Sequence, residues 1–333
     1  MSAAIRVVVA AANAPIRREM AAALRQQGIV ATDVTLDDLE PSVRATAAEV
    51  AIVFTDRDAG ADEVIGDIMS TRPVPILAVA PSAAKDEALR ALAAGALEVI
   101  AWPETEQDRA GFRAALAASV RLVAGLALVK RRRQKTGDER PTRSATARRI
   151  VAIGASTGGP QALAEILRAL HGQTACPIVI VQHMPAQFMS GFSDWLRRYT
   201  GARVSIAATR ERLEPGRVYL APGDRHLTVS AAGIAHVGAG EPVLSCRPSA
   251  DVLFQSVAPA YGAGAIGALL SGMGEDGARG LLAMRKAGAV TIAQDEASAV
   301  VYGMPAAAAS LKAATEILPL NRIASAVLAA LAE

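Results

Sequence analysis

Residues 150–160 constrain the fold of this chain most strongly, because they join an expected strand to an expected helix through a turn of small residues. Residues 150–153 are apolar and mostly β-branched, and apolar residues recur at helical spacing between positions 162 and 170. Glycines in the turn permit backbone conformations that a Cβ atom forbids, and the start of the helix directs N–H groups back at the turn. We therefore predict that Ser156, which lies in this turn, is a nucleophile.

The length and composition of the chain limit what it can be. A chain of 333 residues suits two domains. It is 52% apolar but only 3% aromatic, so its cores must be built from Ala, Val, Leu and Ile. No apolar run approaches the roughly 20 residues that span a bilayer, and no signal-peptide pattern follows Arg6. We expect a cytoplasmic protein without membrane insertion.

The two cysteines, Cys176 and Cys246, are too few for a disulfide framework, and they lack the spacing of a zinc site. We therefore expect no metal and no cofactor.

Strands and helices are expected to alternate through residues 1–128. The expected strands are 5–10, 30–34, 49–55, 75–79 and 97–101, and the expected helices are 15–25, 62–70, 86–94 and 109–128. Such alternation predicts a parallel sheet with helices on both faces. Five units of this kind match the flavodoxin-like strand order, which places Asp56 at a strand end near the switch point.

Residues 129–148 interrupt this alternation. The stretch 130–149 holds nine basic residues against Asp138 and Glu139, with several Gly, Pro, Ser and Thr residues. We interpret 129–148 as a flexible linker. Docking onto an acidic surface or nucleic acid is the alternative, but no aromatic residue is present to stack on bases. Because the formal net charge of the chain is only +3, we expect no nucleic-acid partner.

The alternation resumes in residues 149–333, so we predict an α/β protein with two doubly wound domains. In the second half, three expected strands lead to reactive side chains, at Ser156, His183 and Asp276. The carboxyl ends of parallel strands open onto one edge of a sheet. A hydroxyl, an imidazole and a carboxylate that meet there are the components of a serine hydrolase triad.

Each of these residues also has a simpler interpretation. Ser156 could be a turn residue, His183 a satisfied polar group and Asp276 a helix N-cap. His226 competes with His183, as a secondary site residue or a structural one. The glycine spacing around Ser156 matches the nucleophile elbow of α/β-hydrolases, but the order of the other two residues does not, because here the histidine precedes the acid. The sequence contains no phosphate-loop motif.

Six motifs together resemble the chemotaxis-type protein-glutamate methylesterases, the CheB family. They lie at residues 154–160, 182–185, 221–226, 247–254, 272–277 and 294–298. The resemblance covers about 150–330, the second domain, and implies a parallel-sheet methylesterase fold. It implies Ser156 as nucleophile, His183 as general base and acid, and Asp276 as the residue that orients His183. It further implies oxyanion and substrate-binding roles for Thr157, Gly158, Met273 (through its backbone N–H) and Gly274.

The resemblance implies a substrate and a partner. The substrate is a glutamate methyl ester on the cytoplasmic helices of a methylated chemoreceptor, hydrolysed to glutamate and methanol, and some family members also deamidate glutamine. Two other functions stay open: a catalytically silent adaptor that binds receptor helices or a kinase, and a serine esterase for small molecules.

The first half departs from the phosphorylatable receiver domain that the resemblance implies. The acidic pair of the family falls at Ala11 and Ala12, its switch hydroxyl at about Ala80, and its lysine at Trp102. Only Asp56 stands at the phospho-acceptor position. Since the acidic pair would hold Mg²⁺, we predict a pseudo-receiver, a docking or gating domain that is not driven by phosphate. It is either constitutively permissive or responds to a partner, such as a chemosensory kinase or another regulatory protein.

Overall fold

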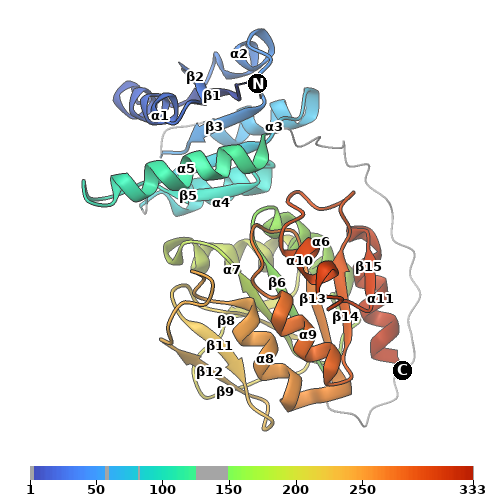
Figure 1. The fold of residues 1–333 in the computed structure, drawn as a ribbon. Coiled ribbons are helices and arrows are strands. Elements are labelled where there is room, and N and C mark those ends of the chain that lie inside the picture. The colour runs from blue at the N-terminus through green and yellow to red at the C-terminus, as the bar shows by residue number, and fades with distance from the viewer. Residues whose placement is uncertain (1–3, 57–59, 82, 125–148, 333) are drawn as a thin grey trace. The chain divides into compact units, whose positions relative to one another are not determined.

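The computed structural model describes residues 4–56, 60–81, 83–124 and 149–332 (Figure 1). The chain divides into two compact units, Met1–Arg133 and Gln134–Glu333. The division falls within the predicted linker, 129–148, which lies outside the described residues, so the boundaries at 128 and 149 stay a prediction. In the part of the chain that the structure describes, no helix has both the length and the apolar character of a bilayer span.

The first unit is built on a five-stranded parallel sheet in the order β2-β1-β3-β4-β5. This order confirms the predicted flavodoxin-like arrangement. The strands are β1 (Arg6–Ala10), β2 (Val30–Val34), β3 (Val50–Phe54), β4 (Ile76–Ala80) and β5 (Glu98–Ala101). The helices are α1 (Ala14–Gln26), α2 (Leu39–Ala45), α3 (Ala61–Thr71), α4 (Lys85–Ala94) and α5 (Arg109–Val123).

Two helices of this unit differ from expectation. The sequence analysis missed α2, which has seven residues and buries only Leu39 and Val43, too few to give a helical period. The helix expected over 109–128 ends at Val123, because Ala124 has extended backbone angles. Gly125 follows in the sequence, and glycine is costly inside a helix.

The second unit has a seven-stranded parallel sheet in the order β15-β14-β13-β6-β7-β10-β8, and a three-stranded antiparallel sheet in the order β11-β12-β9. The strands are β6 (Ile150–Ala155), β7 (Ile178–Gln182), β8 (Arg203–Ile206), β9 (Glu211–Arg212), β10 (Arg217–Leu220), β11 (His226–Val229), β12 (Ile234–Gly238), β13 (Ala265–Leu269), β14 (Val290–Gln294) and β15 (Glu316–Leu318). The helices are α6 (Gly159–Leu170), α7 (Ala186–Thr200), α8 (Ala250–Tyr261), α9 (Ala278–Lys286), α10 (Met304–Ser310) and α11 (Leu320–Ala332).

The strands β13, β6 and β7 form the centre of the large sheet (Figure 1). All their residues are buried, because helices cover both faces of the sheet. In register, Leu269 lies opposite Gly154, and Ala155 lies opposite Gln182. The three strands therefore end side by side, which confirms that the loops carrying Ser156, His183 and Asp276 open onto one edge.

The largest omission of the sequence analysis is α8. Its start carries a recognisable signal, since the Ser249 side chain accepts a hydrogen bond from the Val252 N–H as an N-cap. Leu253, Phe254 and Val257 are buried against the central strands. The short elements β12, α10 and β15 were also missed. Of these four, β15 adds an edge strand to the predicted parallel sheet, and β12 joins β11 and β9 in an antiparallel sheet that was not expected.

Candidate active site

A cavity of about 690 Å³ lies at the edge where β6, β7 and β13 end. Ser156, His183 and Asp276, the three residues predicted to form a triad, all line it. A fourth segment, 244–248, completes the lining from the loop before α8. The fold therefore brings together residues that are more than 100 positions apart in the sequence.

Ser156 is held by backbone contacts on both sides. Its N–H donates to the Ser271 carbonyl at 3.0 Å, and its carbonyl accepts from the Gly159 N–H at 2.7 Å. A Cβ atom on Gly272 would lie only 2.7 Å from the Ser156 Cβ and 2.2 Å from the Met304 sulfur. Glycine at 272 thus lets the loop after β13 approach the serine closely.

Gln182 joins the serine loop to the histidine loop. Its side chain is buried at the end of β7, and Nε2 donates to the Ser156 carbonyl at 2.9 Å and to the His183 carbonyl at 3.0 Å. In the sequence Gln182 opens the motif 182–185, but no role was predicted for it. The signal for this role in the sequence was an amide at the end of an apolar strand, directly before the histidine.

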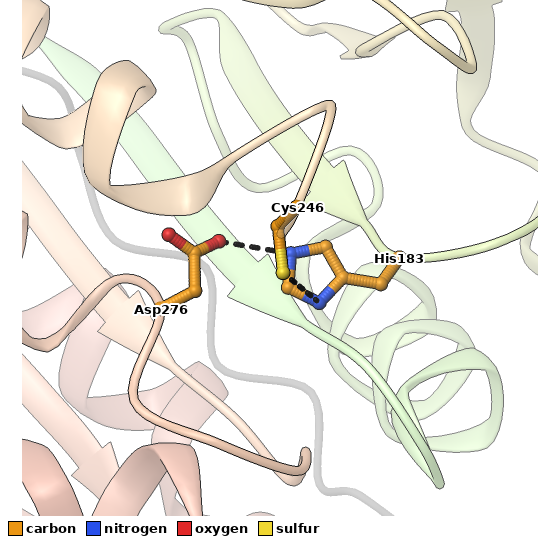
Figure 2. Close-up of side chains that lie close together, drawn as sticks. All are labelled: His183, Cys246 and Asp276. Carbon is orange, nitrogen blue, oxygen red and sulfur yellow. Dashed lines mark hydrogen bonds and ion pairs between the residues drawn. The ribbon is translucent and has the colours of Figure 1, made fainter. Parts of the chain in front are cut away.

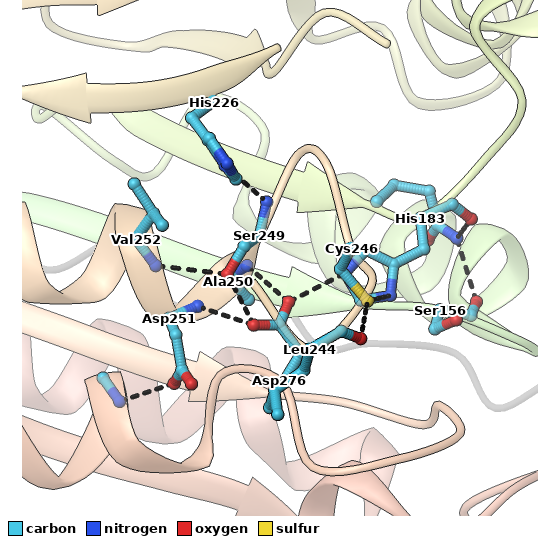
Figure 3. A network of polar contacts seen from close by, with 12 residues as sticks. Ser156, His183, His226, Leu244, Cys246, Ser249, Ala250, Asp251, Val252 and Asp276 are labelled. Carbon is cyan, nitrogen blue, oxygen red and sulfur yellow. Dashed lines mark hydrogen bonds and ion pairs between the residues drawn. The ribbon is translucent and has the colours of Figure 1, made fainter. Parts of the chain in front are cut away.

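Asp276 is buried, and it pairs with His183, which is partly buried. His183 Nε2 donates to Asp276 Oδ2 at 2.9 Å (Figure 3). Burial alone lowers the pKa of His183, but the hydrogen bond with Asp276, together with the contact to Cys246, outweighs it and raises the pKa to about 9. Burial alone raises the pKa of Asp276, but the hydrogen bonds from His183 and Ser249 bring it below its usual range. Both shifts favour an ionised carboxylate beside a protonated imidazole.

The interpretation of Asp276 as the cap of its own helix is wrong. Gly277 occupies the N-cap position of α9, with φ of 89° and no side-chain cap bond. The Asp276 carboxylate instead accepts the N–H groups of Ala250 at 2.6 Å and Asp251 at 3.2 Å, at the start of α8, and the Ser249 hydroxyl at 2.6 Å (Figure 3). Three hydrogen bonds from the start of α8 therefore fix the carboxylate that holds His183.

The contact between α8 and α9 is reciprocal. The Asp251 side chain, in the first turn of α8, accepts the Gly280 N–H of α9 at 2.7 Å. Burial raises the pKa of Asp251. Asp251 lies in α8 and binds an N–H group of α9, whereas Asp276 precedes α9 and binds N–H groups of α8. Both carboxylates lie near the start of a helix, where negative charge is favoured.

We predict that Asp251→Ala destabilises the second unit. The substitution leaves the buried Gly280 N–H unpaired, which costs about 1–3 kcal/mol and lowers the Tm measured in a thermal melt of the full chain. Asp251→Asn keeps an acceptor oxygen and should lose less. The control is Asp194→Ala, because Asp194 is half exposed and pairs only with Arg197 among the described contacts. Equal Tm values for Asp251→Ala and Asp194→Ala would contradict this role.

Cys246 was not considered as a site residue. Its sulfur lies 4.0 Å from His183 Nδ1, the ring nitrogen that does not bind Asp276 (Figure 2). A tight turn positions it: Val243 and Cys246 bond to each other through N–H and carbonyl groups, and Leu244 and Ser245 between them have φ of 48° and 63°. Non-glycine residues seldom adopt such angles, and this signal is not visible in the sequence.

The remaining predicted site residues fall into two groups. Met273, 48% exposed, and Gly274 line the cavity. Thr157 and Gly158 are buried and are not among the described lining residues. The Thr157 carbonyl accepts from the Ser271 hydroxyl at 2.7 Å. The binding roles of all four stay predictions.

His226 contributes to the structure of the network. It is buried in β11, where Nε2 donates to the Glu241 carbonyl at 2.9 Å and Nδ1 accepts the Ser249 N–H at 3.2 Å (Figure 3). The bond from the Ser249 N–H fixes the backbone of Ser249, and the Ser249 side chain in turn binds Asp276.

In the first unit, Asp56 is exposed two residues beyond β3. Trp102, directly after β5, lies where the family resemblance expects a lysine. Its ring meets Phe54 and Phe112 edge-on, with centroids 5.5 and 5.1 Å away, and the Arg109 guanidinium lies 5.5 Å from its centroid. An aromatic cluster thus surrounds the position of that lysine.

Comparisons with known proteins agree with this geometry. The CheB methylesterase family matches residues 151–327. A protein-glutamate methylesterase/protein-glutamine glutaminase of Caulobacter vibrioides is 40% identical and covers 97% of each chain. One of Anaeromyxobacter dehalogenans is 36% identical and covers 96% of this chain and 95% of its own. The crystal structure of the Thermotoga maritima CheB methylesterase catalytic domain is 34% identical, with a TM-score of 0.53, over 56% of this chain and 99% of that one. This chain therefore belongs to the CheB methylesterase family.

Proposed function

We propose that this chain hydrolyses glutamate methyl esters on the cytoplasmic helices of methylated chemoreceptors, and deamidates glutamine at the same sites, through Ser156, His183 and Asp276. The observation that carries the proposal is the pair formed by His183 and the buried Asp276, which shares one cavity with a serine on the neighbouring strand end. Relatives that cover nearly the full chain bear the names of these two activities.

We assign the two nitrogens of His183 different roles. Because Nε2 binds Asp276, Nδ1 is the nitrogen left to accept the Ser156 proton. The serine oxygen attacks the ester carbonyl, and the imidazolium then gives its proton to the departing methanol. Water, activated by the same nitrogen, hydrolyses the acyl-enzyme to glutamate. Asp276 holds the tautomer and stabilises the imidazolium in both steps.

The developing oxyanion needs backbone donors at the cavity wall. We assign this role to the Met273 N–H, since Met273 lies in the glycine-rich loop after β13 and lines the cavity. The Met273 and Leu244 side chains, 48% and 46% exposed, form an apolar part of the same lining. This apolar part of the lining can pack against the apolar surface of a receptor helix around the ester. Each reaction restores a negative charge to the receptor helix, which changes the repulsion between neighbouring acidic groups.

The rate should rise with pH above neutrality. The raised pKa of His183 keeps the imidazole protonated at pH 7, and only the neutral ring can accept the serine proton. We expect kcat/KM to increase as the pH rises toward about 9. The measurement is methanol release at each pH, corrected for the rate of Ser156→Ala. A profile that is already level at the ordinary histidine pKa of about 6.5 would contradict the assignment.

Phosphorylation should not control this chain. With a small phosphodonor and Mg²⁺, we expect no stoichiometric phosphate on Asp56 and no change in the esterase rate, because alanines stand at the positions of the metal-binding acidic pair. The Asp56→Asn variant should respond in the same way as the wild type. Acid-stable, base-labile phosphate on Asp56, accompanied by a faster rate, would contradict the pseudo-receiver. A kinase or another regulatory protein is the proposed partner of this domain.

One experiment separates the proposed function from its two alternatives. Methanol release is measured from a methyl-labelled receptor fragment and from a small methyl ester. The methylesterase releases methanol from the receptor fragment. A silent adaptor binds the fragment without releasing methanol, and a small-molecule esterase turns over the small ester only.

A further inference from the structure

His183, Cys246 and Asp276 present three different ligand atoms, a nitrogen, a sulfur and an oxygen, all within 4.8 Å of one another (Figure 2). The three residues come from separate loops and line the same cavity. We propose that they form an inhibitory binding site for a thiophilic divalent cation such as Zn²⁺. The inhibitory effect rests on the proposed function, whereas the binding does not.

The distances suit a zinc ion. Zinc binds sulfur at about 2.3 Å and histidine nitrogen or carboxylate oxygen at about 2.0–2.2 Å, so tetrahedral ligands lie about 3.3–3.6 Å apart. In the structure Asp276 Oδ2 lies 2.9 Å from His183 Nε2, and Cys246 Sγ lies 4.0 Å from the other ring nitrogen, Nδ1. One ligand atom of each residue lies within 4.8 Å of the other two, so side-chain movements of about 1 Å would bring the three atoms to these separations. The fourth position then faces the cavity, where water can fill it.

The charges also match. A thiolate and a carboxylate together carry two negative charges, and neutral imidazole adds none, so a divalent cation leaves the cluster neutral. Binding releases the thiol proton and the imidazolium proton to solvent. A cysteine and a histidine ligand favour Zn²⁺ and Co²⁺, whereas Mg²⁺ and Ca²⁺ prefer oxygen ligands.

The same geometry makes the cation an inhibitor and not a structural element. Asp276 is already fixed by Ser249 and by the N–H groups at the start of α8, so the fold does not need a metal there. A bound cation would occupy lone pairs on His183 and Asp276. The proton transfer from Ser156 would then lose its acceptor.

The other cysteine provides a matched control. Cys176 is 5% exposed, and burial raises its pKa to about 11, which opposes the thiolate form that metals bind. It is not part of the His183–Cys246–Asp276 cluster. Cys176→Ala therefore removes a thiol without touching the proposed site.

Binding is tested directly by adding Co²⁺ to the full chain and recording the thiolate-to-cobalt charge-transfer absorption. We expect this band, at one Co²⁺ per chain, in the wild type and in Cys176→Ala, and we expect Cys246→Ala to lack it. The absence of the band in the wild type, or its persistence in Cys246→Ala, would overturn the proposal. This arm needs no turnover, so it stands even if the proposed function fails.

Inhibition is tested by measuring methanol release with and without Zn²⁺. For each variant, the rate with Zn²⁺ is divided by the rate without it. We expect Zn²⁺ to inhibit the wild type and Cys176→Ala, EDTA to restore the rate, and Mg²⁺ at the same concentration to have no effect. Cys246→Ala should need at least about 10- to 100-fold more Zn²⁺ for the same inhibition, because losing a ligand costs no less than losing a group that only supports one. Equal sensitivity of Cys246→Ala and the wild type would overturn the proposal.

Discussion

Ser156→Ala should lower methanol release from a methylated receptor fragment by about 10⁴- to 10⁶-fold. The loss is large because the hydroxyl oxygen is the atom that forms the acyl-enzyme, and alanine offers no replacement. KM should change little, since the substitution removes only one oxygen from the cavity wall. The residual rate would come from the oxyanion donors and from substrate binding.

Cys246→Ala is the matched control for this experiment, because Cys246 is the second nucleophile beside His183. It should lose far less activity than Ser156→Ala. If Cys246→Ala lost as much and Ser156→Ala kept most of the rate, the nucleophile would be the thiol and the serine assignment would be wrong.

The second large effect is expected for Asp276→Asn, about a 10⁴-fold loss in kcat. The amide cannot stabilise the imidazolium, and an NH₂ group directed at His183 would favour the wrong tautomer. The substitution also removes the group that raises the pKa of His183. The remaining activity should therefore reach its plateau at a lower pH than in the wild type, and kcat measured across the pH range tests both effects.

A purely structural role for Asp276 would give a different result. Asparagine with its oxygen at the Oδ1 position keeps the acceptor for the Ser249 hydroxyl and the Asp251 N–H, whereas the Ala250 N–H, which binds Oδ2, loses its acceptor. A thermal melt measures this cost to stability. An Asp276→Asn variant with the wild-type Tm, a lower kcat and the wild-type pH profile would contradict the electrostatic role of Asp276.

The parts of the fold that could be predicted are those with a strong local pattern. The strands β6, β7 and β13 are continuous apolar runs bounded by small or polar residues, so their position and their parallel arrangement followed from the sequence. The flavodoxin-like order of the first unit followed in the same way. Even α8 carried a signal, the Ser249 cap, although Pro259 within the helix weakened the pattern.

The rest depends on contacts that no local pattern contains. Asp276 precedes its own helix, and only the packing of α8 against α9 directs its carboxylate to the N–H groups of Ala250 and Asp251. Cys246 approaches His183 because Leu244 and Ser245 adopt positive φ angles, which residues other than glycine seldom do. The spacing of the two cysteines argued against a zinc site, and only the fold shows that Cys246 lies close to His183 and Asp276.

The most direct test of the account is to identify the residue that carries the covalent intermediate. The full chain is treated with a fluorophosphonate, which modifies activated serines, and the labelled peptide is mapped by mass spectrometry with and without a competing methylated receptor fragment. The account predicts label on Ser156, protection by the receptor fragment, and loss of labelling in His183→Ala. Label on Cys246, or labelling of Ser156 that does not depend on His183, would contradict it.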